Sequence, residues 1–212
     1  MTQTLEQIID RWNTGEGKPC KGKLIDYSAY EANSDNIGCM CAQGQVLHLL
    51  GGWEPERLRN TAQEEADAET AKLLNISVAH AILLRNTNDK IDGAPAIVLT
   101  HPAKVLGDQA HNVLAFWMHM DRMTAEQWDA AAAAARDAAW DAAWDAAWAA
   151  AMIAAWNAAW AAARDAAAYA CSEIQGARLL REQGKQFYFL PMFGFDSPEA
   201  IPSLPAGYGK VA

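Results

Sequence analysis

The residues best suited to chemistry are two cysteines in the run Gly38-Cys39-Met40-Cys41, just before a predicted helix. A thiol at a helix N-terminus is a candidate nucleophile, because the helix dipole stabilises the thiolate. The residues that could serve as its base, or orient that base, are His80, His111, His119, Asn88 and Asp89. The spacing does not require this arrangement, and cysteine is often a small buried hydrophobic residue. We therefore predict no catalytic residue; the candidates, if the chain is an enzyme, are Cys39, Cys41, His80 and Asn88.

A metal site is not indicated by the spacing of the potential ligands. Cys20, Cys39, Cys41 and His48 lack the paired Cys-x-x-Cys pattern of zinc sites. His111 and His119 are eight residues apart, whereas zinc ligands on one helix are one turn apart. The sequence also lacks a phosphate-binding glycine loop, Gly-x-Ser-x-Gly and His-Glu-x-x-His. We predict no metal and no cofactor.

The composition of the chain argues against several kinds of partner and cellular location. The 212 residues carry a formal charge of −9, which argues against nucleic acid, because phosphate binding needs clustered lysine and arginine. The four cysteines are too few and too scattered for a disulfide framework, and residues 1–12 do not resemble a signal peptide. The longest uncharged stretch, residues 146–163, is mostly alanine with aspartates close by, so we predict no membrane span. We expect a cytoplasmic protein.

The first half of the chain shows the start signals of several short helices. Capping-box patterns begin at Thr4 and Thr61, and Ser77 can cap a helix that runs to Arg85. A further helix is predicted from about Cys41 to Leu50, where Gly51-Gly52 ends it. The apolar run Ala96–Thr100 is the one segment before the tail that we predict to be a strand.

The most unusual feature is a tract in which the unit Trp-Asp-Ala-Ala recurs between Trp128 and Trp160. A capping box at Thr124 precedes it, and no glycine or proline occurs from residue 108 to residue 175. We predict one helix from Thr124 to Gln175, about 75 Å long at ~1.5 Å per residue. The fold class is then mainly α, with a helical domain at 1–122, the long helix at 123–176 and an extended tail, rich in aromatic residues and proline, packed on the body at 177–212.

Bulky side chains stand at every fourth position of this predicted helix, with alanine almost everywhere between them. The positions that we predict to form an interface are Arg136, Trp140, Trp144, Trp148, Met152, Trp156, Trp160 and Arg164. Since a helix has ~3.6 residues per turn, positions four apart rotate by ~40° at each step, so the tryptophans spiral around the axis. Such an apolar surface exceeds what soluble monomers leave exposed. We predict self-association, at least to a dimer.

The order of residue types along this tract is nearly palindromic about residue 150, which fits an antiparallel pair of helices around a two-fold axis. An acidic ridge of Asp137, Asp141 and Asp145 accompanies the tryptophans. Like charges one turn apart are mildly destabilising. The ridge either keeps an apolar helix soluble or meets a basic host protein, and both interpretations stay open.

Two resemblances accompany these patterns. The segments Cys41-Ala42-Gln43-Gly44-Gln45, Gly51-Gly52 and Thr87-Asn88-Asp89 are similar to motifs of a helical domain in uncharacterised bacterial and phage proteins. Gln45 stands where that family has alanine, and Thr87 where it has tryptophan. The family implies no catalytic residue. The Trp-Asp-Ala-Ala tract resembles those of hypothetical phage and bacterial proteins, some described as immunity proteins.

Together these features predict a non-enzymatic, self-associating interaction protein of phage or mobile-element type. By analogy, its target would be a host defence protein or toxin. A structural component of a phage particle, located in the virion, is the alternative, and a cysteine-dependent enzyme is a second one.

Overall fold

The computed structural model describes residues 3–90, 95–142 and 189–210. Throughout these ranges the regular structure is helical, and the β-type pairing is a single antiparallel bridge between Ile25 and Met40. The mainly α fold class is therefore confirmed. The chain forms two compact units, one of Met1–Val105 with Pro205–Ala212 and one of Leu106–Leu204. They are called unit 1 and unit 2 and are described separately.

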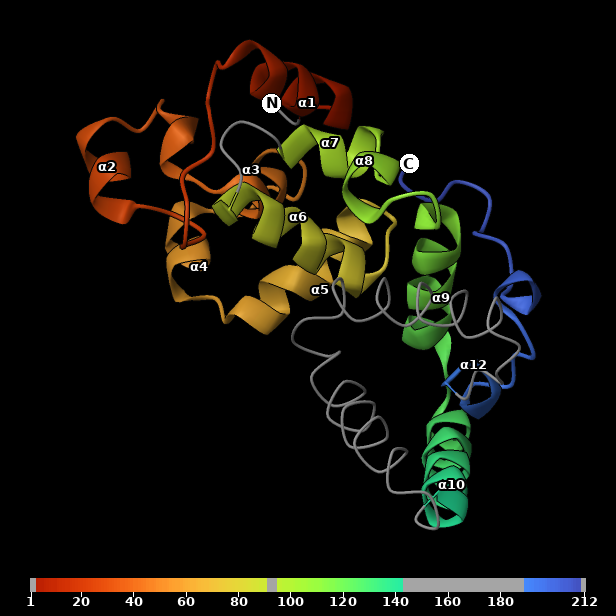
Figure 1. Ribbon diagram of the computed structural model, residues 1–212. Coiled ribbons are helices and arrows are strands. Elements are labelled where there is room, and N and C mark those ends of the chain that lie inside the picture. The colour runs from red at the N-terminus through yellow and green to blue at the C-terminus, as the bar shows by residue number, and fades with distance from the viewer. Residues whose placement is uncertain (1–2, 91–94, 143–188, 211–212) are drawn as a thin grey trace. The chain divides into compact units, whose positions relative to one another are not determined.

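Unit 1 is organised around a central helix. Its elements are α1 (Leu5–Thr14), α2 (Tyr27–Ala32), η1 (Ile37–Cys39), α3 (Ala42–Leu49), α4 (Pro55–Asn60), α5 (Gln63–Leu73), α6 (Val78–Lys90) and α7 (Pro95–Thr100), and α8 (Ala103–Leu106) lies at its boundary (Figure 1). Helix α3 packs against α1, α4, α5 and α6. Its residues from Ala42 to Leu47 are all buried, so this stretch of the helix has no side exposed to solvent.

Local capping explains where several helices begin. Thr4 and Gln7 form the predicted capping box of α1, which buries Leu5, Ile8 and Trp12. The Ser77 hydroxyl accepts the His80 amide at 3.2 Å, as a cap of α6 should. Helix α6 continues to Lys90, beyond the predicted end at Arg85.

The capping box predicted at Thr61 is wrong. The Thr61 hydroxyl instead donates to the Arg57 carbonyl, 2.7 Å away in α4. Ala62 occupies the N-cap of α5 and offers no side-chain hydrogen bond. The preceding helix thus competes for the same hydroxyl, as threonine side chains near a helix end often allow.

The predicted strand Ala96–Thr100 is also wrong, because these residues form α7. Periodicity cannot separate a short apolar strand from a short buried helix. In a helical unit a lone strand would leave its backbone groups without partners, whereas a helix pairs many of them internally. Pro95 suits the first turn, and α7 packs against α1 and α6 with Ala96 and Val98 buried.

Unit 2 contains α9 (Ala110–Arg122), α10 (Ala125–Ala142), α12 (Phe189–Met192) and η2 (Pro198–Ala200). Helix α9 buries an apolar stripe that includes Val113, Phe116 and Trp117. Thr124 and Gln127 exchange the two hydrogen bonds of the capping box at the start of α10, at 2.8 and 3.3 Å. The predicted continuation of this helix from 143 to 175 lies outside the described residues.

The tail of unit 2 is not extended throughout, because α12 and η2 interrupt it. Its apolar side chains nevertheless pack on the helices of this unit. Phe193 meets Phe116 edge to face at 5.1 Å, and Phe195 meets His119 at 4.8 Å. These aromatic contacts hold the segment after α12 against α9, since edge-to-face pairs bury a large apolar area.

Among the helices within 3–90, 95–142 and 189–210, none combines the length and the apolar character that a bilayer crossing requires.

Candidate functional site

The candidate cysteines meet at the N-terminus of α3. Cys41 is the N-cap, and its Sγ accepts the Gly44 amide at 3.4 Å. The segment that contains Cys20 lies alongside, because the Cys20 amide donates to the Met40 carbonyl at 3.0 Å and its thiol to the Cys39 carbonyl at 3.1 Å. The structure therefore brings together three cysteines that the sequence places up to 21 residues apart.

Burial disfavours the thiolate form of all three cysteines. Burial raises the pKa of Cys41 to about 12 and that of Cys20 to about 11, and it also raises the pKa of Cys39. Loss of hydration penalises the thiolate more than the start of α3 and its hydrogen bonds favour it. Cys41 acts here as a buried cap.

His80 is not positioned as the base of a cysteine nucleophile. Its Nδ1 lies 2.9 Å from the Tyr208 hydroxyl, and its Nε2 lies 2.9 Å from the Val98 carbonyl. Both ring nitrogens are thus engaged away from the thiols. The other two candidate histidines, His111 and His119, belong to α9 of unit 2.

Asn88 does reach the cysteine segment, but through the backbone. Its side-chain amide donates to the Cys20 carbonyl at 2.7 Å and to Asp89 at 3.2 Å. Asp89 in turn accepts the Gly22 amide at 2.9 Å. This pair ties α6 to the loop around residue 20, which is a positioning role.

The four potential metal ligands of the sequence are not assembled. His48 bonds through Nδ1 to the Trp53 carbonyl at 2.7 Å. Across the ranges that the structure describes, no group of three or more histidine, cysteine, aspartate or glutamate side chains is arranged to hold a metal ion.

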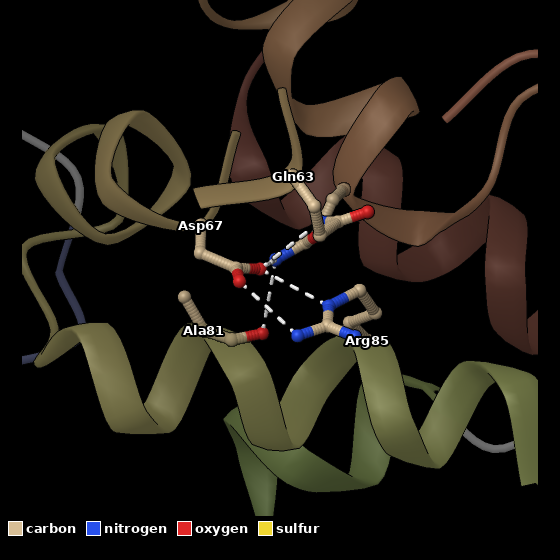
Figure 2. A network of polar contacts seen from close by, with 5 residues as sticks. Gln63, Asp67, Ala81 and Arg85 are labelled. Carbon is tan, nitrogen blue, oxygen red and sulfur yellow. Dashed lines mark hydrogen bonds and ion pairs between the residues drawn. The ribbon is translucent and has the colours of Figure 1, made fainter. Parts of the chain in front are cut away.

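The strongest polar arrangement of unit 1 is one that sequence reasoning missed (Figure 2). The Arg85 guanidinium donates two hydrogen bonds, each of 3.1 Å, to the Asp67 carboxylate. Gln43 donates to the same carboxylate at 2.7 Å and to the Ala81 carbonyl at 3.1 Å. Gln63 donates to Gln43 at 3.0 Å and to Asp67 at 3.2 Å.

This network joins α3, α5 and α6 inside the unit. Gln43 is fully buried, and the side chains of Asp67 and Arg85 are 6% and 23% exposed. Both carboxylate oxygens of Asp67 accept hydrogen bonds, and this bidentate pair together with Gln43 and Gln63 links the three helices. The sequence signal for this network is the presence of Gln43 and Gln45 in a helix with several apolar residues, because buried polar groups need partners.

Gln45 forms a second buried hub in α3. Its carbonyl oxygen accepts the Trp12 indole N–H at 2.9 Å. Its amide group donates to the carbonyls of Gly17, Ile37 and Met40, at 2.9, 3.1 and 3.2 Å. Gln45 thus fastens the loop before α3 to that helix.

The cysteines give a direct prediction. We expect Cys39→Ala and Cys41→Ala variants to fold and to keep their oligomeric state, each losing about 1 kcal/mol of unfolding free energy. In the native chain Cys41 should resist iodoacetamide at pH 7.5 and react once urea unfolds it. Rapid alkylation of native Cys41, or a folded variant that loses its function, would instead favour a cysteine-dependent enzyme.

The predicted interface falls only partly within the described residues. Arg136, Asp137, Trp140 and Asp141 all belong to α10. The remaining predicted positions lie outside the described residues, namely Trp144, Asp145, Trp148, Met152, Trp156, Trp160 and Arg164.

Comparison with known proteins adds no relative. No family model, no curated protein and no solved structure matches this chain.

Proposed function

We propose that this chain is a non-enzymatic interaction protein that associates with copies of itself through the helix beginning at Thr124. One observation carries the proposal: α10 opens with exposed residues, among them Trp128, which is 39% exposed. An exposed tryptophan at the head of a tryptophan repeat supports an interface, since tryptophan is a common binding hot spot.

The packing within unit 2 supports the same proposal. Among the described elements, α10 packs against the four-residue α12, and Trp128 meets Phe193 edge to face at 6.1 Å. The helix continues through Arg136 and Trp140 in the four-residue register of the repeat. In that register each step turns by ~40° around the axis, so the tryptophans would need partners on more than one side. A second copy offers both indole rings and alanine surface.

Self-association has a direct test. The wild type should be at least dimeric at micromolar concentration in sedimentation velocity or light scattering. Trp144→Ala with Trp156→Ala should shift it toward monomer, because these two positions flank residue 150, the centre of the nearly palindromic tract. Met152→Leu keeps side-chain volume and should leave the oligomer intact. A stable wild-type monomer whose tryptophans resist acrylamide quenching would refute the proposal.

The biological setting follows by analogy, as an inhibitor of a host defence protein or toxin encoded by a phage or mobile element. The acidic ridge that begins at Asp137 suits a basic target. Affinity purification from infected cells tests this: an inhibitor should retain a defined host protein, and charge-neutralising changes in the ridge should release it. Recovery with virion proteins would favour the structural alternative.

A further inference from the structure

The C-terminal segment of the chain is docked on the corner between α5 and α6, all within unit 1. The Asn75 side-chain amide donates to the Gly207 carbonyl at 2.6 Å, and the Gly209 amide donates to the Asn75 carbonyl at 3.0 Å. Asn75 has a φ of 48°, a left-handed conformation that asparagine tolerates better than most residues. The corner between α5 and α6 therefore binds the C-terminal segment through both the backbone and the side chain of Asn75.

The Tyr208 hydroxyl enters a small polar site at this corner. It lies 2.9 Å from His80 Nδ1 and 3.4 Å from both the amide nitrogen and the Oγ of Ser77. The Tyr208 and His80 rings stack at 5.8 Å with an interplanar angle of 13°. Ser77 is fully buried and His80 is 3% exposed. Three groups thus converge on one hydroxyl oxygen.

The hydrogen-bond directions in this site follow from its acceptors. The Val98 carbonyl can only accept, so His80 Nε2 carries a proton and donates at 2.9 Å. In a neutral imidazole Nδ1 is then an acceptor, and the Tyr208 O–H donates to it. The Tyr208 oxygen in turn accepts the Ser77 amide. Protonation of His80 would turn Nδ1 into a donor, so the Tyr208 O–H would lose the acceptor that it has there and would have to reorient.

We propose that Ser77 and His80 form a docking site for the chain's own C-terminal tyrosine, which holds the tail while His80 is neutral and releases it when His80 is protonated. The occupant is residues 205–210 of this chain. The proposal is independent of self-association, since it concerns contacts within unit 1.

The electrostatics of the site set the direction of the switch. The His80 ring is faced by the Tyr208 phenol from the tail, the Ser77 hydroxyl from the start of α6 and the Val98 carbonyl from α7. None of the described charged side chains contributes to the shift of its pKa, and burial lowers that pKa to about 4. A released, hydrated imidazole has a pKa of ~6.5. The open form thus binds a proton more readily, so acidification from pH 6.5 toward 4 favours opening.

Hydrogen exchange of the full chain tests this switch. Protection of the 205–212 peptide, corrected for intrinsic rates, should fall about 30-fold from pH 7.5 to pH 5 if the released ring regains its ordinary pKa. A peptide from buried α3 should keep its protection and serves as the internal control. Parallel loss in both peptides would mean general unfolding and would overturn the proposal.

Two variants separate the roles of the partners. His80→Gln cannot titrate and should abolish the pH dependence of tail protection. Tyr208→Phe keeps the stacked ring but lacks the hydroxyl, so protection of the tail at pH 7.5 should fall about tenfold. Wild-type protection in Tyr208→Phe, or unchanged pH dependence in His80→Gln, would overturn the proposal. If circular dichroism shows that the His80→Gln variant does not fold, the Tyr208→Phe variant tests the proposal instead, because Tyr208 is only half-buried.

Discussion

Replacing Arg85 by methionine is expected to lower the free energy of unfolding by about 3 kcal/mol, because it leaves the Asp67 carboxylate buried without its cation. Methionine keeps most of the aliphatic volume, so the loss reports on charge more than on packing. Urea unfolding followed by circular dichroism measures the change. The matched control is Lys72→Met, because Lys72 pairs with Glu69 on the surface at 77% side-chain exposure. The control should change stability by no more than about 0.5 kcal/mol.

A second substitution identifies the origin of the loss. Asp67→Asn in the Arg85→Met background removes the unpaired charge and keeps an oxygen that can accept from Gln43. This double variant should recover part of the stability, since the penalty of breaking a buried pair lies largely in the charge left behind. A single Arg85→Met variant as stable as wild type would show that the network does not hold these helices together.

Gly44→Ala is expected to destabilise the chain by about 3 kcal/mol or more, at the upper end of overpacking costs. A Cβ at this position would overlap the Leu24 carbonyl oxygen and would lie 3.1 Å from its carbon and 3.2 Å from Met40 Cβ. The obstacle is backbone, which is itself held by the bond from the Cys41 amide to the Leu24 carbonyl. Thermal and urea unfolding give the measurement.

Gly52→Ala is the informative control for this change. Gly52 has a φ of 66° but open space around its Cβ direction, so alanine there should cost about 1–2 kcal/mol from backbone strain alone. Helix propensity makes the opposite prediction for Gly44, because alanine is favoured over glycine within a helix by about 1 kcal/mol. A Gly44→Ala variant more stable than wild type would show that the loop does not approach α3 so closely.

Local signals were readable from the sequence wherever the interacting residues lie within one helical turn. The caps at Thr4, Ser77 and Thr124 were predicted and are present, because each hydroxyl reaches an amide three residues away. The helical class followed from these caps and from apolar spacing. Thr61 shows the limit: its hydroxyl had a competing acceptor in the helix before it.

The candidate site was only partly predictable. The sequence located Cys41 at the start of a helix, but the pKa of its thiol depends on burial by segments distant in the chain. His80 and Asn88 are the candidate partners of a cysteine thiol. In the structure His80 contacts the Tyr208 hydroxyl instead, and Asn88 bonds to the backbone carbonyl of Cys20. The spacing of residues along the chain does not reveal such contacts, because residues that are distant in sequence and meet in the fold follow no regular interval.

By itself the sequence determined the helical class of this protein and the caps at Thr4, Ser77 and Thr124, since these depend on neighbours within a few residues. The tertiary structure decided that Ala96–Thr100 is a helix and that Asp67 pairs with Arg85. It also placed Tyr208 on His80, 128 residues earlier in the chain. The physical reason is that burial sets the cost of an unpaired polar group. Which groups are buried, and beside which partners, depends on how distant segments pack.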